Sequence, residues 1–170
     1  MAPMRHRPTS DALTSEPLGV GAAAPDLTLR DQHGADLGLA DLRGGPALVV
    51  FYPYAFSGVC TSELRDLARS AELAAALDRT GAALVGVSCD PVFTQRAFAD
   101  AEGLDFPLLS DFWPHGALAA AFGVLDAKRG CPRRSSFLLD ADGVVRWALH
   151  HGMGEPRTVT QHLAALDAVG

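Results

Sequence analysis

Two continuous apolar runs in the first half of the chain constrain the fold more than any other feature. They cover residues 46–52 (PALVVFY) and 82–88 (AALVGVS). Short unbroken apolar runs are typical of strands that are buried on both faces of a sheet. Between them, apolar side chains recur at steps of three and four residues over 59–79, which predicts a single helix. A strand, a helix and a strand in this order predict a parallel βαβ unit.

The remaining segments add strands and helices on either side of this unit. The expected elements are hairpins at 26–39 and 135–149, a strand at 107–110, and helices at 91–102, 111–122 and 159–169. Asp90 is expected to cap the helix at 91–102, with Pro91 at its first position. The whole order predicts an α/β fold, a three-layer sandwich around a mixed central sheet. It is the element order of a thioredoxin-like domain.

Length and N-terminal composition predict one domain with a tail. A chain of 170 residues is one domain of ordinary size. Residues 1–16 are polar and lack hydrophobic periodicity, so we expect them to form a flexible tail and residues 17–170 to form the domain. The N-terminus lacks the apolar core of a signal peptide, and three cysteines are a poor disulfide framework. We therefore expect a cytoplasmic protein.

Charge and residue spacing argue against several classes of function. Lys and Arg total 14 against 20 Asp and Glu, and the net charge of −6 disfavours nucleic acid and anionic membranes as partners. The longest apolar run is too short to cross a bilayer. The six histidines and three cysteines lack the spacing of a zinc site, so we expect no metal and no other cofactor.

Cys60 is the residue on which the chemistry of the chain depends. It follows the first apolar run in the segment 53–60 (PYAFSGVC), which leaves the end of a buried strand and enters the expected helix. That edge is where α/β sheets bind ligands, and a helix N-terminus stabilises a thiolate. Most free cysteines, however, are small buried hydrophobes. The residues alone therefore leave both a reactive and a structural Cys60 open.

The spacing of Pro53, Ser57 and Cys60 resembles the Pro-x-x-x-Thr/Ser-x-x-Cys motif of the peroxiredoxin family. Segment 134–140 (RSSFLLD) is similar to the strand that carries the active-site arginine of that family. Segment 108–116 (LLSDFWPHG) resembles the one-Cys group called alkyl hydroperoxide reductase E, found in actinobacteria. The resemblance implies a thioredoxin fold and a thiol-specific peroxidase that reduces hydrogen peroxide and organic hydroperoxides.

The resemblance also implies a role for each matched residue. The Cys60 thiolate attacks the peroxide, which the Ser57 hydroxyl and the Cys60 N–H bind. Arg134 stabilises the thiolate and the substrate together. Pro53 shields the sulfur from water, and Glu63 orients the arginines. The alternative for Glu63 is an acidic residue in the first helical turn, favoured by the helix dipole.

Arg133 and Arg134 are adjacent, and two features of the sequence indicate which of them reaches Cys60. The family pattern Arg-x-x-Phe, counted back from Phe137, selects Arg134. Neighbouring residues of a strand also point to opposite faces, so only one of the two can reach Cys60. Arg133 is therefore expected to face solvent.

Oxidised Cys60 can be reduced by more than one route. Some family members use a second cysteine five residues downstream, but that position is Arg65, and no cysteine follows Cys131. By resemblance to the one-Cys group, reduction comes from an external thiol such as mycothiol, or from a mycoredoxin-, glutaredoxin- or thioredoxin-like protein. Alternatively Cys89, at the same sheet edge, or Cys131, shortly before Arg134, resolves Cys60 within the chain, or the two pair with each other. We expect instead that Cys89 and Cys131 are buried thiols without a role in the reaction.

Two other functions fit parts of the sequence. A thiol–disulfide oxidoreductase of the same fold needs a Cys-x-x-Cys pair, and Ser57 stands where its first cysteine belongs. A redox sensor that uses the oxidation of Cys60 as a signal is compatible with every residue discussed. The family commonly dimerises near its active site, so we expect a homodimer, with residues 112–118 as a candidate contact.

Overall fold

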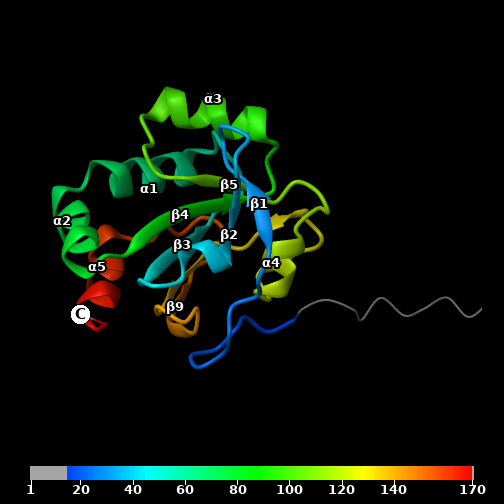
Figure 1. The fold of residues 1–170 in the computed structure, drawn as a ribbon. Helices are drawn as coiled ribbons and strands as arrows, with labels where there is room; N and C mark the ends of the chain where they lie inside the picture. Colours follow the sequence, from blue (N-terminus) through cyan, green and yellow to red (C-terminus); the bar gives the residue numbers. More distant parts are fainter. Residues whose placement is uncertain (1–14, 170) are drawn as a thin grey trace, which may run out of the picture.

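A mixed sheet of seven strands forms the centre of the molecule. The computed structural model describes residues 15–169, and its sheet has the strand order β2-β1-β5-β4-β3-β8-β9 (Figure 1). The strands are β1 (Thr28–Arg30), β2 (Asp36–Gly38), β3 (Ala47–Phe51), β4 (Ala83–Ser88), β5 (Leu108–Ser110), β8 (Ser135–Leu139) and β9 (Val145–His150). β3, β4 and β5 run parallel, whereas the strands at both edges pair antiparallel. The predicted mixed sheet and both predicted hairpins are confirmed.

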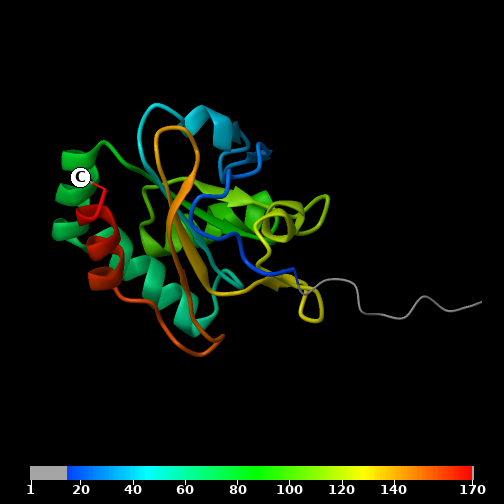
Figure 2. The same cartoon turned by 90° about the horizontal axis from the view of Figure 1, so that it is seen from below.

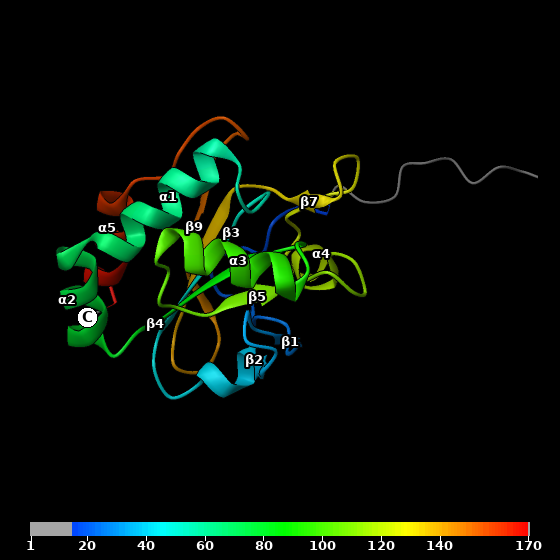
Figure 3. The same cartoon turned by 90° about the horizontal axis from the view of Figure 1, so that it is seen from above.

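Helices cover both faces of this sheet, as the three-layer prediction requires. One face carries α1 (Gly58–Arg69), α2 (Ala71–Thr80), α3 (Val92–Glu102) and α5 (Val159–Asp167), which share one buried apolar cluster with the sheet. Figure 3 shows α1 and α3 side by side over the strands, and Arg65 of α1 donates to Glu102 of α3 at 2.9 Å. The opposite face carries α4 (Ala117–Ala121) and the segment before β1 (Figure 2), while a 3-10 turn at Leu39–Leu42 follows β2.

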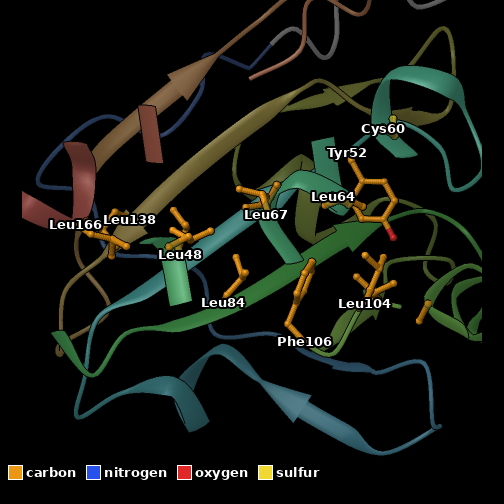
Figure 4. Close-up of a cluster of buried hydrophobic side chains, with 14 of the residues drawn as sticks. Leu48, Tyr52, Cys60, Leu64, Leu67, Leu84, Leu104, Phe106, Leu138 and Leu166 are labelled. Atoms are coloured by element: carbon orange, nitrogen blue, oxygen red, sulfur yellow. The ribbon is translucent and has the colours of Figure 1, made fainter. Parts of the chain in front are cut away.

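The alternation of side chains along β3 explains why this strand is apolar throughout. Leu48 and Val50 point into the cluster beneath α1 and α2, while their neighbours point into a second cluster on the opposite face. Figure 4 shows the first cluster, with Cys60 and Tyr52 at the same end of it. Cys60 therefore lies where the apolar core meets the C-terminal end of β3.

The single helix predicted at 59–79 is wrong, because the chain forms two helices that are separated at Ser70. Ser70 has an extended backbone (φ −75°, ψ 111°), and its hydroxyl accepts the Leu73 N–H at 3.0 Å. This bond caps α2. Both helices turn apolar side chains toward the same cluster, so the apolar periodicity continues across the break and hides it.

The helix predicted at 111–122 is wrong in its first half. Only α4 is helical, and it follows Gly116, whose φ is 71°. The buried Asp111 carboxylate accepts the N–H groups of Leu118 at 3.0 Å and Ala119 at 2.9 Å. Asp111 therefore caps α4 from a loop rather than beginning a helix itself.

The start of α3 also differs from the prediction. Pro91 is the N-cap residue, the helix begins at Val92, and the Pro91 side chain makes no capping hydrogen bond. The Asp90 carboxylate accepts the Ala55 N–H instead, at 2.8 Å, on the loop that follows β3. A two-stranded ribbon of β6 (Leu125–Asp126) and β7 (Cys131–Pro132) was not predicted at all.

At the N-terminus, the structure describes the chain from residue 15 onward. Most of the predicted flexible tail at 1–16 lies outside the described residues, so it stays a prediction. Leu18 already packs against the domain, since its N–H donates to the Phe122 carbonyl at 3.0 Å. Between residues 15 and 169, no helix combines the length and apolar character needed to cross a membrane.

Candidate active site

Cys60 lies in the first turn of α1, directly after the loop that leaves β3. Ser57 is the N-cap residue, and its carbonyl accepts the Thr61 N–H at 2.9 Å. The first turn of a helix presents N–H groups without intrahelical partners and the positive end of the helix dipole. Cys60 is 0% exposed. Its sulfur is therefore enclosed by protein at a position that favours negative charge.

Strand pairing brings Arg134 to this sulfur. β8 is antiparallel to β3, with Ser135 opposite Phe51, so Arg134 lies beside the loop that carries Cys60. Arg134 Nη1 is 3.5 Å from Cys60 Sγ, and Nη2 donates to the Met153 carbonyl at 2.8 Å. The sheet thus brings together two of the residues selected from the sequence, which are 74 positions apart.

Glu63 links Arg134 to a second buried arginine that the sequence analysis did not identify. Glu63 lies one helical turn after Cys60, and its Oε2 accepts a hydrogen bond from Arg134 Nη1. Arg157 donates to the same carboxylate from its backbone N–H at 2.6 Å, from Nε at 3.0 Å and from Nη2 at 3.1 Å. All three side chains are at most 2% exposed. Charge-assisted bonds of this kind fix the direction of both guanidinium groups.

The cluster of Glu63, Arg134 and Arg157 carries more positive than negative charge. Burial alone would raise the pKa of Glu63, but the bonds and charge of Arg157, and then the charge of Arg134, hold it below its usual value of 4.5. The carboxylate is therefore ionised at neutral pH and balances only one of the two guanidinium groups. An anionic sulfur on Cys60 would balance the other.

Ser136 and His162 extend this cluster to α5. Arg157 Nη1 donates to Ser136 Oγ at 3.0 Å, and Ser136 Oγ lies 2.9 Å from His162 Nε2. Burial lowers the pKa of His162 to about 4, so the ring is neutral at neutral pH. Its Nδ1 lies 2.8 Å from the Thr158 carbonyl, which can only accept. Nδ1 therefore carries the proton, and the Ser136 hydroxyl donates to Nε2.

Pro53 and Ser57 both lie on the loop between β3 and α1. Pro53 is buried and Ser57 is half-buried. The Ser57 hydroxyl does not cap α1, so it is available to a ligand, and no hydrogen bond within the described residues joins it to Cys60. Phe56, between them, has a φ of 64°, and its ring centroid lies 5.2 Å from that of Phe98. A bulky residue rarely adopts this left-handed conformation, so the loop is strained there.

Cys89 and Cys131 are buried free thiols. They are 7% and 0% exposed, and neither forms a disulfide in the described part of the chain. Burial raises the pKa of Cys89 to about 12, and burial is also the main cause that raises the pKa of Cys131. A thiol that stays protonated is a poor nucleophile. In this conformation neither thiol is prepared to attack an oxidised Cys60.

Arg133 is less exposed than predicted, although it points away from Cys60 as expected. The residue is half-buried, and its Nη2 donates to the Gly123 carbonyl next to α4. This carbonyl lies just past the end of that short helix, and it holds the Arg133 guanidinium against the domain. Of the two adjacent arginines, Arg134 is the one that contacts Cys60.

Comparison with known proteins places this chain and its fold among related chains. Residues 20–148 match the model of the AhpC/TSA family. Alkyl hydroperoxide reductase E of Mycobacterium tuberculosis is 41% identical over 155 residues, which cover 89% of this chain and 99% of that protein.

Two solved structures show the same architecture. The crystal structure of peroxidoxin BcpB from Mycobacterium tuberculosis superposes with a TM-score of 0.76 at 32% identity, covering 89% of this chain and 97% of that one. For AhpC of Enterococcus faecalis the TM-score is 0.80 at 29% identity, with 88% and 90% covered. The predicted thioredoxin-like fold is thereby confirmed. The chain belongs to the AhpC/TSA family, the peroxiredoxins, which are thiol peroxidases that reduce hydroperoxides.

Proposed function

We propose that this peroxiredoxin is of the one-Cys type: Cys60 reduces hydrogen peroxide and organic hydroperoxides, and an external thiol restores it. The contact of 3.5 Å between Arg134 Nη1 and Cys60 Sγ carries this proposal. A guanidinium is always charged and stabilises a thiolate at short range. The excess positive charge of the cluster of Glu63, Arg134 and Arg157 also favours a thiolate on Cys60.

In the proposed reaction the Cys60 thiolate attacks the terminal oxygen of the hydroperoxide. An S–O bond forms as the O–O bond breaks, so Cys60 becomes a sulfenic acid, and the leaving alkoxide or hydroxide takes a proton to become an alcohol or water. Negative charge moves from the sulfur to the leaving oxygen, so hydrogen-bond donors are needed near both atoms to stabilise it. Arg134, the Ser57 hydroxyl and the Cys60 N–H are the proposed donors. Pro53 is proposed to shield the sulfur, and Glu63 to orient Arg134.

Replacing Arg134 by alanine is expected to slow the oxidation of Cys60 by at least about tenfold, because it removes donors aimed at developing charge. Stopped-flow fluorescence with hydrogen peroxide in a single turnover measures this rate constant. Arg133→Ala is the matched control, since it removes the neighbouring guanidinium, which bonds to the Gly123 carbonyl instead. An unchanged rate constant in Arg134→Ala would remove Arg134 from the proposed mechanism.

Recycling by an external thiol is supported by the state of the other two cysteines. Both are buried with raised pKa values, so we expect Cys89→Ser and Cys131→Ser to keep the first oxidation step. Mass spectrometry under non-reducing conditions, after one equivalent of peroxide, should find Cys60 as a sulfenic acid. A disulfide from Cys60 to Cys89 or Cys131 within one chain would contradict this proposal and support internal resolution.

A redox sensor that uses the same cysteine is the second candidate. The complete burial of Cys60 favours it, because an enclosed sulfur restricts the approach of a bulky reductant. Turnover with a supplied reductant separates the two functions. Many cycles per protein support the peroxidase, whereas a single cycle supports the sensor.

The partners of the chain stay predictions. The proposed reductant is mycothiol or a mycoredoxin-, glutaredoxin- or thioredoxin-like protein, and the proposed location is the cytoplasm. The proposed homodimer is supported by the exposure of Phe112 (48%) and Trp113 (79%) in the segment 112–118. Large apolar side chains at the surface are typical of a protein contact.

A further inference from the structure

Asp90 lies where the loop after β4 runs beside the loop that carries the Cys60 site. β3 and β4 are parallel neighbours, so the loops that follow them leave the same edge of the sheet. Asp90 Oδ2 accepts the Ala55 N–H at 2.8 Å, in the middle of residues 53–57. This side chain is the point at which the second loop holds the first.

The Asp90 carboxylate is the end of a chain of hydrogen bonds that runs through Ser88 and Gln95 to Tyr52. The Ser88 hydroxyl donates to Asp90 Oδ2 at 2.6 Å and accepts from Gln95 Nε2 at 2.8 Å. Gln95 Oε1 in turn accepts from the Tyr52 hydroxyl, and Tyr52 directly precedes the loop that Asp90 holds. Tyr52, Ser88 and Gln95 are each 0% exposed. A buried polar chain in which each member has a partner is rigid.

The helix that follows Asp90 makes no use of this carboxylate. The N-cap of α3 is Pro91, whose side chain makes no capping hydrogen bond. The Asp90 backbone is itself held in place, because Ser110 Oγ donates to its carbonyl at 2.6 Å. Because hydrogen bonds hold both its backbone and its carboxylate, the Asp90 side chain stays directed at Ala55.

The bond from Asp90 lies beside the strained residue of the loop. Phe56, with its φ of 64°, directly follows Ala55 and directly precedes Ser57, the N-cap of α1. A non-glycine residue keeps such a conformation only where surrounding contacts enforce it. The bond from Asp90 to the Ala55 N–H is one of the contacts that enforce the conformation of this loop, directly before Phe56 and Ser57.

We propose that Asp90 is a positioning residue for the reduction of peroxide at Cys60. By holding the Ala55 N–H, it keeps residues 53–57 in one conformation and sets the Ser57 hydroxyl at the distance from the sulfur that a bound peroxide requires. Asp90 touches neither the sulfur nor the substrate and acts through the loop alone. This inference rests on the proposed peroxidase function.

Two single-turnover reactions of Cys60 test the inference. In Asp90→Ala, oxidation by hydrogen peroxide is expected to slow by about tenfold, because small displacements of aligned groups have effects of this size or larger. Alkylation of the same sulfur by iodoacetamide needs no aligned peroxide and is expected to stay unchanged or become faster. A role that is merely structural would change both rate constants in the same direction.

Two further variants serve as rescue and control. Asp90→Asn keeps an oxygen that can accept from both Ala55 and Ser88, so its peroxide rate constant should return to within about threefold of the wild type. Asp100→Ala removes an exposed carboxylate from the last turn of α3 and should change neither reaction. Hydrogen exchange should become faster in the peptide that covers residues 53–57 in Asp90→Ala and in neither of these two variants. If Asp90→Ala does not fold, Asp90→Glu takes its place, since it keeps the charge and displaces the carboxylate.

The possible outcomes separate this inference from the function on which it rests. A wild-type chain that fails to react with peroxide refutes the proposed function. A reactive wild type, with the ratio of the two rate constants unchanged in Asp90→Ala, overturns the role of Asp90. An equal loss in Asp90→Asn also overturns it, because the charge and not the anchoring bond would then be responsible.

Discussion

The Cys60→Ser variant is expected to lose peroxide consumption by on the order of 1,000-fold or more, since a serine hydroxyl stays protonated at neutral pH and is a weak nucleophile. The substitution changes one buried atom at the start of α1, so the fold should persist. Peroxide consumption, followed with an excess of a low-molecular-weight thiol as reductant, measures the effect. Near-ultraviolet circular dichroism checks that the variant is folded.

The two other cysteines provide matched controls for this experiment. Cys89→Ser and Cys131→Ser also remove a buried thiol from the same region, and each should oxidise at the wild-type rate in the first turnover. If Cys60→Ser consumes peroxide as fast as the wild type, the proposed chemistry belongs to another residue and the site described above is not catalytic.

Replacing Glu63 by glutamine should produce the largest loss of stability. The amide keeps the shape of the side chain but leaves Arg134 and Arg157 buried without a carboxylate. Removing one partner from a buried ion pair typically costs about 3–5 kcal/mol of the free energy of unfolding. For a domain of this size, such a loss corresponds to a decrease of roughly 10 °C in Tm. Urea denaturation and calorimetry at pH 7 measure both quantities.

The same substitution should alter how stability depends on pH. In the folded chain the pKa of Glu63 lies below its ordinary value of 4.5, so near that pH the unfolded state binds more protons than the folded state. The contribution of Glu63 to stability is therefore present above about pH 4.5 and is lost as the pH falls through the lowered pKa. The difference in stability between the wild type and Glu63→Gln should shrink over that acidic range. The lowered pKa of His162 also reduces the stability of the fold at acidic pH. Because His162 is present in both proteins, it does not contribute to the difference between them.

Glu72→Gln is the matched control for Glu63→Gln. Glu72 is an exposed acidic residue in the first turn of α2, and the Ser70 hydroxyl contacts it at 3.2 Å. Its replacement should change the free energy of unfolding by less than about 0.5 kcal/mol. If Glu63→Gln changes stability as little as this control, other groups compensate the buried charges, and Glu63 is not the counter-ion of Arg134 and Arg157.

The fold was largely predictable because its central strands are buried on both faces. The runs at 46–52 and 82–88 must be apolar throughout, and that pattern is easy to recognise. The break at Ser70 was not predictable from the same kind of pattern, since both helices keep their apolar side chains on the core side. At α4, the cap is Asp111, a residue outside the helix, so the residues at its boundary did not mark where it begins.

The site was predictable only where residues are close in the sequence or belong to a spaced motif. Pro53, Ser57 and Cys60 lie on one loop and helix start, and Arg134 was selected by its distance from Phe137. Arg157 could not be found in this way, because it stands alone in an irregular segment before α5. Its contact with Glu63 is created by tertiary structure across 94 positions.

The charge of the cluster of Glu63, Arg134 and Arg157 also affects the proposed reduction of oxidised Cys60 by an external thiol. In the proposed reaction, the Cys60 thiolate and the Glu63 carboxylate together neutralise Arg134 and Arg157. A sulfenic acid is neutral, so oxidation leaves one buried guanidinium without a counter-ion, which is an unfavourable arrangement. A reductant that arrives as an anion restores neutrality, whereas an uncharged thiol does not. The two arginines, for which we propose a role in the attack on peroxide, should therefore also make the oxidised protein select reductants by their charge.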